Sequence, residues 1–247
     1  AQQLAACERV LIVAHGELGA LPMGALHDGR CSLAERHELA FAPSARLAQR
    51  GLSWQPSVIR RVLALGESTR LPHAAQEAQA VAALWPDAEA LVGARATSSA
   101  LRQQAKSADV IHLACHAQFR TDNPAFSSLV MHDGPLSAES IESLQLSGAV
   151  VVLSGCETAL HDGAAGDEAF GLTRAFLVAG AARVLSSLWA VDDATTAQLM
   201  GGFHAGLRAG LNPAAALRQA QLAVRARHDA ARADDRRGRR ALRARLG

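Results

Sequence analysis

The chain has 247 residues, of which 49% are apolar and 19% charged, and its formal net charge is +2. This is the composition of an ordinary globular protein and not of a disordered or fibrous one. The four cysteines show no CxxC spacing, which excludes a disulfide-stapled secreted domain and favours a reducing cytosol. No apolar run reaches the roughly 18 residues that a membrane span requires, and the first residues do not form a signal peptide. We therefore expect a cytoplasmic protein without a membrane partner.

Short apolar runs alternate with helical patterns along the chain. The expected strands cover residues 8–15, 37–43, 58–66, 88–93, 108–115, 148–155 and 181–191. The expected helices cover 73–85, 97–107, 137–144, 166–180, 193–209 and 213–229. Thr97 and Ser137 are placed to cap two of these helices, Gly180 to end one and Pro213 to begin another. The segment 116–134 has no periodicity and is expected to be a loop with a turn at Asp133-Gly134.

Alternation of strands and helices at this spacing predicts an α/β fold, in which a mostly parallel central sheet carries helices on both faces. Length alone leaves one or two domains open, and we expect a single domain over residues 1–228. The remaining residues, 229–247, are rich in arginine and poor in apolar anchors. We interpret them as a solvated basic tail, and the alternative is a patch for nucleic acid or another acidic partner. We do not expect a nucleic-acid partner.

Polar residues follow three of the expected strands. His116 follows ADVIHLAC, Cys156 follows VVVLSG, and Asp193 comes shortly after SSLWAV. The carboxyl ends of parallel strands meet at one edge of a sheet, where function gathers. The forty residues from His116 to Cys156 are enough for a right-handed crossover, so the two side chains can approach each other if their strands are neighbours.

A cysteine beside a histidine forms a nucleophile at neutral pH. The imidazole takes the thiol proton, and the thiolate attacks a carbonyl carbon. The backbone amides of Cys156 and Ala117 are candidates to hold the oxyanion, and His116 would then protonate the leaving amine.

Several long motifs resemble the CHAT domain, a caspase-like peptidase domain often attached to tetratricopeptide repeats. They are IHLACHAQFRTDNPAFSSLVMHDGPLSAESI, VVLSGCETAL, GDEAFGLTRAFLVAGAARVLSSLWAVDD and AAALRQAQ. The resemblance implies a three-layer caspase-like fold, a Cys-His dyad formed by Cys156 and His116, and excision from a longer, repeat-containing protein. Caspase-like peptidases usually have glycine after the catalytic histidine; here the residue is Ala117, which keeps the backbone amide.

The stretch WAVDD, residues 189–193, resembles the part of separase that supplies an acidic residue to the pocket for the side chain before the cut. The resemblance implies that Asp193 selects arginine or lysine by charge-assisted hydrogen bonds. Trp189 belongs to the SSLWA strand, along which an extended substrate would add by backbone pairing. The alternative is that Asp192 or Asp193 only caps the following helix.

Rival interpretations use the same residues differently. A zinc site of His112, Cys115, His116 and Cys156 is disfavoured, because His112 and Cys115 alternate faces within a strand. We expect Cys115 to be a buried structural residue and His112 to be a hydrogen-bonded core residue. A nucleotide site lacks any glycine-rich phosphate loop.

The sequence therefore predicts a cysteine endopeptidase without metal or organic cofactor, acting on protein or peptide substrates, with cleavage after a basic residue. We expect a regulatory protein or attached repeat domain to control it. The alternative is a catalytically silent CHAT-like interaction module.

Overall fold

The fold is seen in a computed structural model. It describes residues 4, 6–14, 18–19, 21–52, 58–69, 71–118, 120, 126–154, 167–187 and 193–246, with the side chains of 50–52, 167–170, 193–194 and 233–246 left aside. Its strands are β1 (Arg9–Ile12), β2 (Glu38–Phe41), β3 (Val62–Gly66), β4 (Ala88–Val92), β5 (Val110–Ala114), β6 (Ala117–Gln118), β7 (Ser128–Met131), β8 (Gly134–Ser137), β9 (Val150–Ser154) and β10 (Arg183–Ser186). Its α-helices are α1 (Leu33–Arg36), α2 (Ala45–Leu52), α3 (Ala74–Ala83), α4 (Ser98–Gln104), α5 (Ala138–Glu142), α6 (Asp167–Val178), α7 (Asp193–Arg208) and α8 (Pro213–Leu246).

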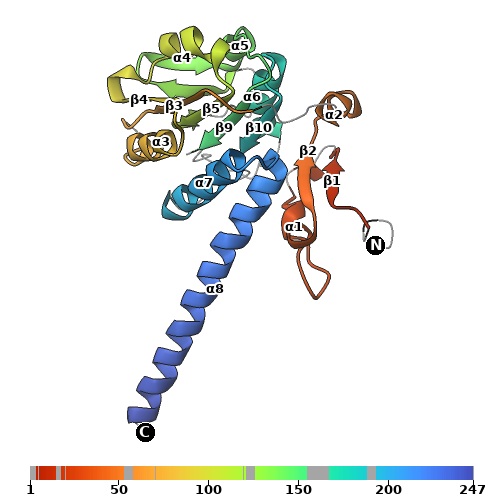
Figure 1. The fold of residues 1–247 in the computed structure, drawn as a ribbon, viewed down its shortest axis with the longest axis vertical. Helices are drawn as coiled ribbons and strands as arrows, with labels where there is room; N and C mark the ends of the chain where they lie inside the picture. Colours follow the sequence, from red (N-terminus) through yellow and green to blue (C-terminus); the bar gives the residue numbers. More distant parts are fainter. Residues whose placement is uncertain are drawn as a thin grey trace.

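A five-stranded parallel sheet forms the centre of the molecule, in the order β10-β9-β5-β3-β4. Helices α3 and α7 cover one face, and α4, α5 and α6 cover the other (Figure 1). The middle strands β3, β5 and β9 are buried along their whole length, which is why their sequences are continuous apolar runs and not alternating ones. The predicted α/β fold with a mostly parallel sheet between helices is confirmed.

Alternate residues of each central strand belong to different apolar cores. Ile111 and Leu113 of β5 pack with Phe176 of α6 on one face. Val110 of the same strand packs with Phe203 of α7 on the other. All of these side chains are fully or almost fully buried, so the sheet has no solvent-facing surface at its centre and its chemistry has to lie at a strand end.

Local signals fix the ends of several helices as predicted. The Thr97 hydroxyl accepts the Ala100 N–H at 3.0 Å, and the Ser137 hydroxyl accepts the Ser140 N–H at 3.2 Å. Gly180 has φ +105° just after α6, where an added Cβ would lie 2.2 Å from the Leu146 carbonyl oxygen. Only glycine fits that position.

The prediction that residues 116–134 form a loop is wrong in part. This segment contributes β6 and β7, which join β8 in a three-stranded antiparallel sheet. The turn at Asp133-Gly134 is present: His132 and Asp133 connect β7 to β8, and Gly134, the first residue of β8, has φ +119°. The Asp133 carboxylate accepts the Ser98 N–H at 2.7 Å and so ties this hairpin to the start of α4. Strands this short carry no detectable alternation, so the sequence did not reveal them.

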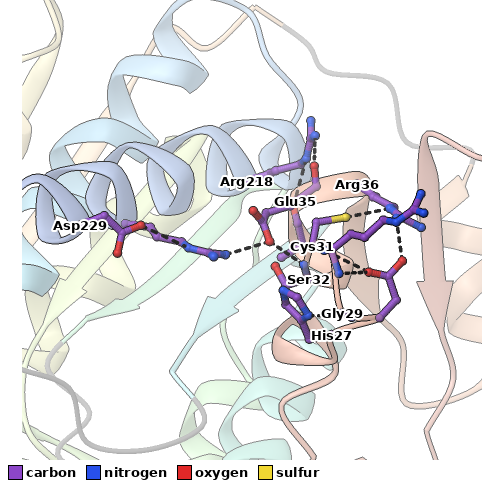
Figure 2. A network of polar contacts seen from close by, with 12 residues as sticks. His27, Gly29, Cys31, Ser32, Glu35, Arg36, Arg218 and Asp229 are labelled. Carbon is purple, nitrogen blue, oxygen red and sulfur yellow. Dashed lines mark hydrogen bonds and ion pairs between the residues drawn. The ribbon is translucent and has the colours of Figure 1, made fainter.

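The N-terminal strands β1 and β2 pair with each other and not with the central sheet. Helix α8 connects this segment to the body. Arg218 of α8 donates to the carbonyl oxygens of Ala34 and Glu35, and Arg225 lies 2.8 Å from the Glu35 carboxylate, which also accepts the Ser32 N–H (Figure 2). Beyond these contacts α8 continues as a helix past residue 229 and projects from the body (Figure 1).

Within the described ranges, none of the helices combines the length and the apolar character needed to cross a membrane.

Candidate active site

Strands β5 and β9 are neighbours, and their carboxyl ends meet in register. Ala114 pairs with Ser154, and the Cys115 N–H donates to the Ser154 carbonyl at 3.3 Å. His116 lies two residues beyond Ala114 and is partly exposed to solvent. Cys156 lies two residues beyond Ser154 in the sequence and falls outside the described residues. The predicted dyad requires that the strands before His116 and Cys156 be neighbours. Strands β5 and β9 meet this condition.

The amide of Ala117 is oriented away from the neighbouring hairpin. In an antiparallel pair, residues that exchange N–H···O bonds alternate with residues that do not. The Val130 N–H donates to the His116 carbonyl at 2.8 Å, so His116 and Val130 form the bonded pair and Ala117 and Leu129 the non-bonded pair. The Ala117 N–H thus points away from β7. No described non-glycine residue has a positive φ, so alanine is accommodated here without strain.

A buried carboxylate lies at the same edge of the sheet, at the end of β3. Glu67 is 2% exposed, and its N–H donates to the Ala114 carbonyl at 3.0 Å. Its carboxylate accepts the backbone N–H of Thr69 at 3.1 Å and also the Thr69 hydroxyl. These bonds satisfy the carboxylate locally and hold the β3–α3 turn beside the end of β5.

A chain of buried polar side chains runs beneath the sheet and ends at β9. Trp85 Nε1 lies 3.4 Å from His204 Nδ1, and His204 Nε2 lies 3.2 Å from His112 Nδ1. His112 Nε2 lies 3.1 Å from Oε1 of Glu77, a polar contact that is not aligned for a straight hydrogen bond. The Ser154 hydroxyl donates to the same Glu77 oxygen. We call these five residues the buried polar chain.

The direction of the buried polar chain follows from donor and acceptor chemistry. An indole N–H can only donate, so Nδ1 of His204 accepts from Trp85 and carries no proton. The proton of His204 then sits on Nε2 and is donated to His112 Nδ1. A His112 ring that accepts at Nδ1 carries its own proton on Nε2, which faces Glu77. Glu77 therefore accepts from the Ser154 hydroxyl at one end of the chain and faces the His112 N–H on the other side.

Burial and hydrogen bonding set the protonation of these groups. Burial lowers the pKa of His204 well below 6.5, so His204 is neutral. Burial acts to raise the pKa of Glu77, but the contact with His112 and the Ser154 hydroxyl outweigh it and bring that pKa below its ordinary value. Glu77 is consequently an ionised carboxylate enclosed between α3 and the sheet.

His112 and Cys115 lie on opposite faces of the sheet. His112 is fully buried against α3 and α7, whereas Cys115 belongs to the core formed with α4, α5 and α6. The predictions of a hydrogen-bonded core histidine and a buried structural cysteine are confirmed. The two therefore cannot share an ion, so a zinc site that uses both of them is excluded. No group of three potential metal ligands occurs among the residues that the structure describes.

The predicted substrate residues are only partly described. Asp193 is the first residue of α7, and its side chain is among those left aside, so the pocket interpretation and the capping alternative both stay predictions. Trp189 lies outside the described residues. Strand β10, from which the SSLWA segment continues, is an edge strand of the central sheet within the described ranges.

Glu77, His204 and Ser154 were not predicted from the sequence as site residues. Their partners are 77 and 92 residues away along the chain, so no local spacing announces them. One signal was available. Glu77 lies three residues after Ala74, on the face of α3 that Ala74 and Ala78 bury, and a carboxylate on a buried helix face requires a partner.

A parallel sheet of this order between two layers of helices is consistent with a caspase-like fold. Residues 1–237 match the CHAT domain family, and the chain therefore belongs to that family, which is related to the caspase-like cysteine peptidases.

Two curated relatives carry the same region. They are tetratricopeptide repeat protein 28 of Homo sapiens and of Mus musculus, each 30% identical over 192 residues. The alignment covers 62% of this chain and 8% of each relative. The chain thus spans less than a tenth of the length of the relatives it matches.

Proposed function

We propose that this domain is a cysteine endopeptidase in which Cys156 is the nucleophile and His116 the general base and acid. The register of Ala114 with Ser154 carries the proposal. It aligns the ends of the two strands that the dyad residues follow, and His116 is partly exposed at that edge, where a substrate can reach it.

The reaction requires only these groups and water. His116 takes the proton of the Cys156 thiol, and the sulfur forms a bond to the carbonyl carbon of the scissile peptide. His116 then gives that proton to the leaving amine as the carbon–nitrogen bond breaks. Water, deprotonated by His116, hydrolyses the thioester and restores the thiol.

The tetrahedral intermediate carries a negative oxygen that needs donors. The Ala117 N–H is one candidate, supported by its orientation away from β7, and the Cys156 N–H is the other. Donors of this kind act at the oxygen where charge develops, and removing one typically costs about 10²- to 10³-fold in kcat.

For substrate selection we propose Asp193 as the partner of an arginine or lysine before the cut, with Trp189 in the strand along which the substrate binds. The edge position of β10 supports pairing of an extended peptide with this side of the sheet. The substrate would be a protein or peptide in the cytoplasm.

Regulation by a repeat domain or partner protein is part of the proposal. The two relatives are named for tetratricopeptide repeats, and the matched region is 8% of each. The same observation favours the second candidate, a catalytically silent module that serves interaction within a larger protein.

A peptide-library cleavage assay separates the two candidates. The purified chain is compared with its Cys156→Ala and Cys115→Ala variants. We expect cleavage after arginine or lysine by the chain and by Cys115→Ala, and none by Cys156→Ala. Cleavage that survives in Cys156→Ala would exclude the proposed nucleophile, and a chain that cleaves nothing even with its repeat-containing partner would support the silent module.

A further inference from the structure

Ser154 is the last residue of β9 and immediately precedes the segment that carries Cys156. It is 2% exposed, and its hydroxyl donates to Glu77 of α3, a residue 77 positions earlier in the chain. A hydroxyl in a buried strand needs such a partner. Here the partner is an ionised carboxylate, which makes the bond stronger than one between neutral groups.

Glu77 is itself held in place from the other side. His112 of β5 lies against the same carboxylate oxygen, and His204 of α7 holds the His112 ring through its Nδ1. The ring centroids of His112 and His204 lie 5.2 Å apart and the ring planes meet at 66°, an edge-on packing. The carboxylate therefore connects β9, β5 and, through the two imidazoles, α7.

We propose that Glu77 and Ser154 are positioning residues: their bond fixes the end of β9 against β5 and so sets where Cys156 stands relative to His116. This rests on the proposed function for its catalytic consequence. The carboxylate does not touch the substrate. It acts on the nucleophile indirectly: it binds Ser154, the last residue of β9, and Cys156 follows two positions later in the sequence.

A matched pair of variants isolates the hydroxyl. Ser154→Thr and Ser154→Val add side chains of the same shape at the same strand position, and only threonine can donate to Glu77. The proposal expects Ser154→Thr to keep a kcat near that of the unaltered chain. It expects Ser154→Val to lose between about tenfold and 100-fold in kcat, the cost of a misplaced reacting group, with KM changed far less.

Glu77→Gln tests the carboxylate, with Val81→Ala as its control. Val81 is buried on the same helix and packs in the core beside the sheet, but it belongs to no part of the buried polar chain. If Glu77 matters only for helix packing, Val81→Ala should lower both thermal stability and kcat, as Glu77→Gln does. The proposal expects Val81→Ala to lower thermal stability without lowering kcat. It expects Glu77→Gln to lower kcat by a factor similar to that of Ser154→Val.

The alkylation rate of Cys156 by iodoacetamide, followed by mass spectrometry of the Cys156 peptide, provides a readout that does not need hydrolysis. The proposal expects this rate to differ between Ser154→Val and Ser154→Thr while the rate at Cys31 stays equal. Equal Cys156 rates in the pair, or equal kcat values, would overturn it. If the unaltered chain shows no Cys156-dependent hydrolysis, the proposed function fails, and the alkylation rates still decide the positioning role.

Discussion

Ala114 and Ser154 pair across the boundary between β5 and β9, at the last residue of both strands. This pairing places the start of the His116 segment beside the start of the Cys156 segment. The register fixes this placement, because each residue along β5 from Val110 onward is paired with one along β9 from Val150 onward. The register of the sheet thus fixes where the two segments begin.

The first prediction concerns His116. His116→Ala should lower kcat for peptide hydrolysis between about 10²- and 10⁴-fold, the usual contribution of a general acid–base group. Because His116 is only partly buried, thermal stability should hardly change. His132→Ala, at an exposed histidine of the β7–β8 turn, is the control and should keep full activity. Hydrolysis rates that are equal in the two variants would remove His116 from the mechanism.

The second prediction concerns the pocket residue. Asp193→Asn keeps the shape of the side chain at the start of α7 and removes its charge. If Asp193 receives a basic side chain, kcat/KM for an arginine peptide should fall about 10- to 100-fold, because a charged hydrogen bond contributes about 1.5–3 kcal/mol. The value for a leucine peptide should stay the same. An equal loss for both peptides would favour the capping alternative.

The third prediction tests the packing of α3 on the sheet. An added Cβ at Gly66 would lie 2.4 Å from the Ala74 carbonyl oxygen, a backbone atom that cannot move aside. Gly66→Ala should therefore lower the free energy of unfolding by about 2 kcal/mol, as overpacking does.

Gly201 supplies the control for this substitution. It lies within α7 and has nothing within 4 Å of an added Cβ, so Gly201→Ala should raise the free energy of unfolding by up to about 1 kcal/mol. Chemical denaturation of the two variants checks both signs. A stable Gly66→Ala protein would show that the close contact between β3 and α3 is not as tight as described.

The fourth prediction concerns the attachment of α8 to the N-terminal segment. The Ser32 backbone and side chain, assisted by Arg225, hold the pKa of Glu35 at about 2, below its ordinary 4.5. A carboxyl whose pKa is lowered on folding contributes stability above its unfolded pKa and loses it as the pH falls through the folded one. The difference in thermal stability between the unaltered chain and Glu35→Gln should thus be constant above pH 5 and shrink between about pH 4.5 and 2. A difference that is the same at pH 3 and pH 7 would contradict this.

The sequence was a good guide to the elements that carry strong local patterns. The strands that became β5 and β9, the caps at Thr97 and Ser137 and the glycine after α6 were all predicted, because each depends on residues close together in the chain. The alternation rule also placed His112 and Cys115 on opposite faces correctly.

The buried polar chain could not be predicted in the same way. Its members come from two helices, two strands and the turn after α3, and nothing in any one segment tells which carboxylate meets which imidazole. Tertiary packing alone decides that. For the same reason the short strands β6 and β7 were missed, since their pairing and not their pattern defines them.

Covalent labelling with an arginine-containing peptidyl electrophile, followed by mass spectrometry of all four cysteine peptides, tests the central claim most directly. The account predicts an adduct on Cys156 that forms much faster than any on Cys7 or Cys31 and that slows greatly in His116→Ala. Labelling spread evenly over the exposed cysteines, or labelling of Cys156 at the same rate with and without His116, would contradict it.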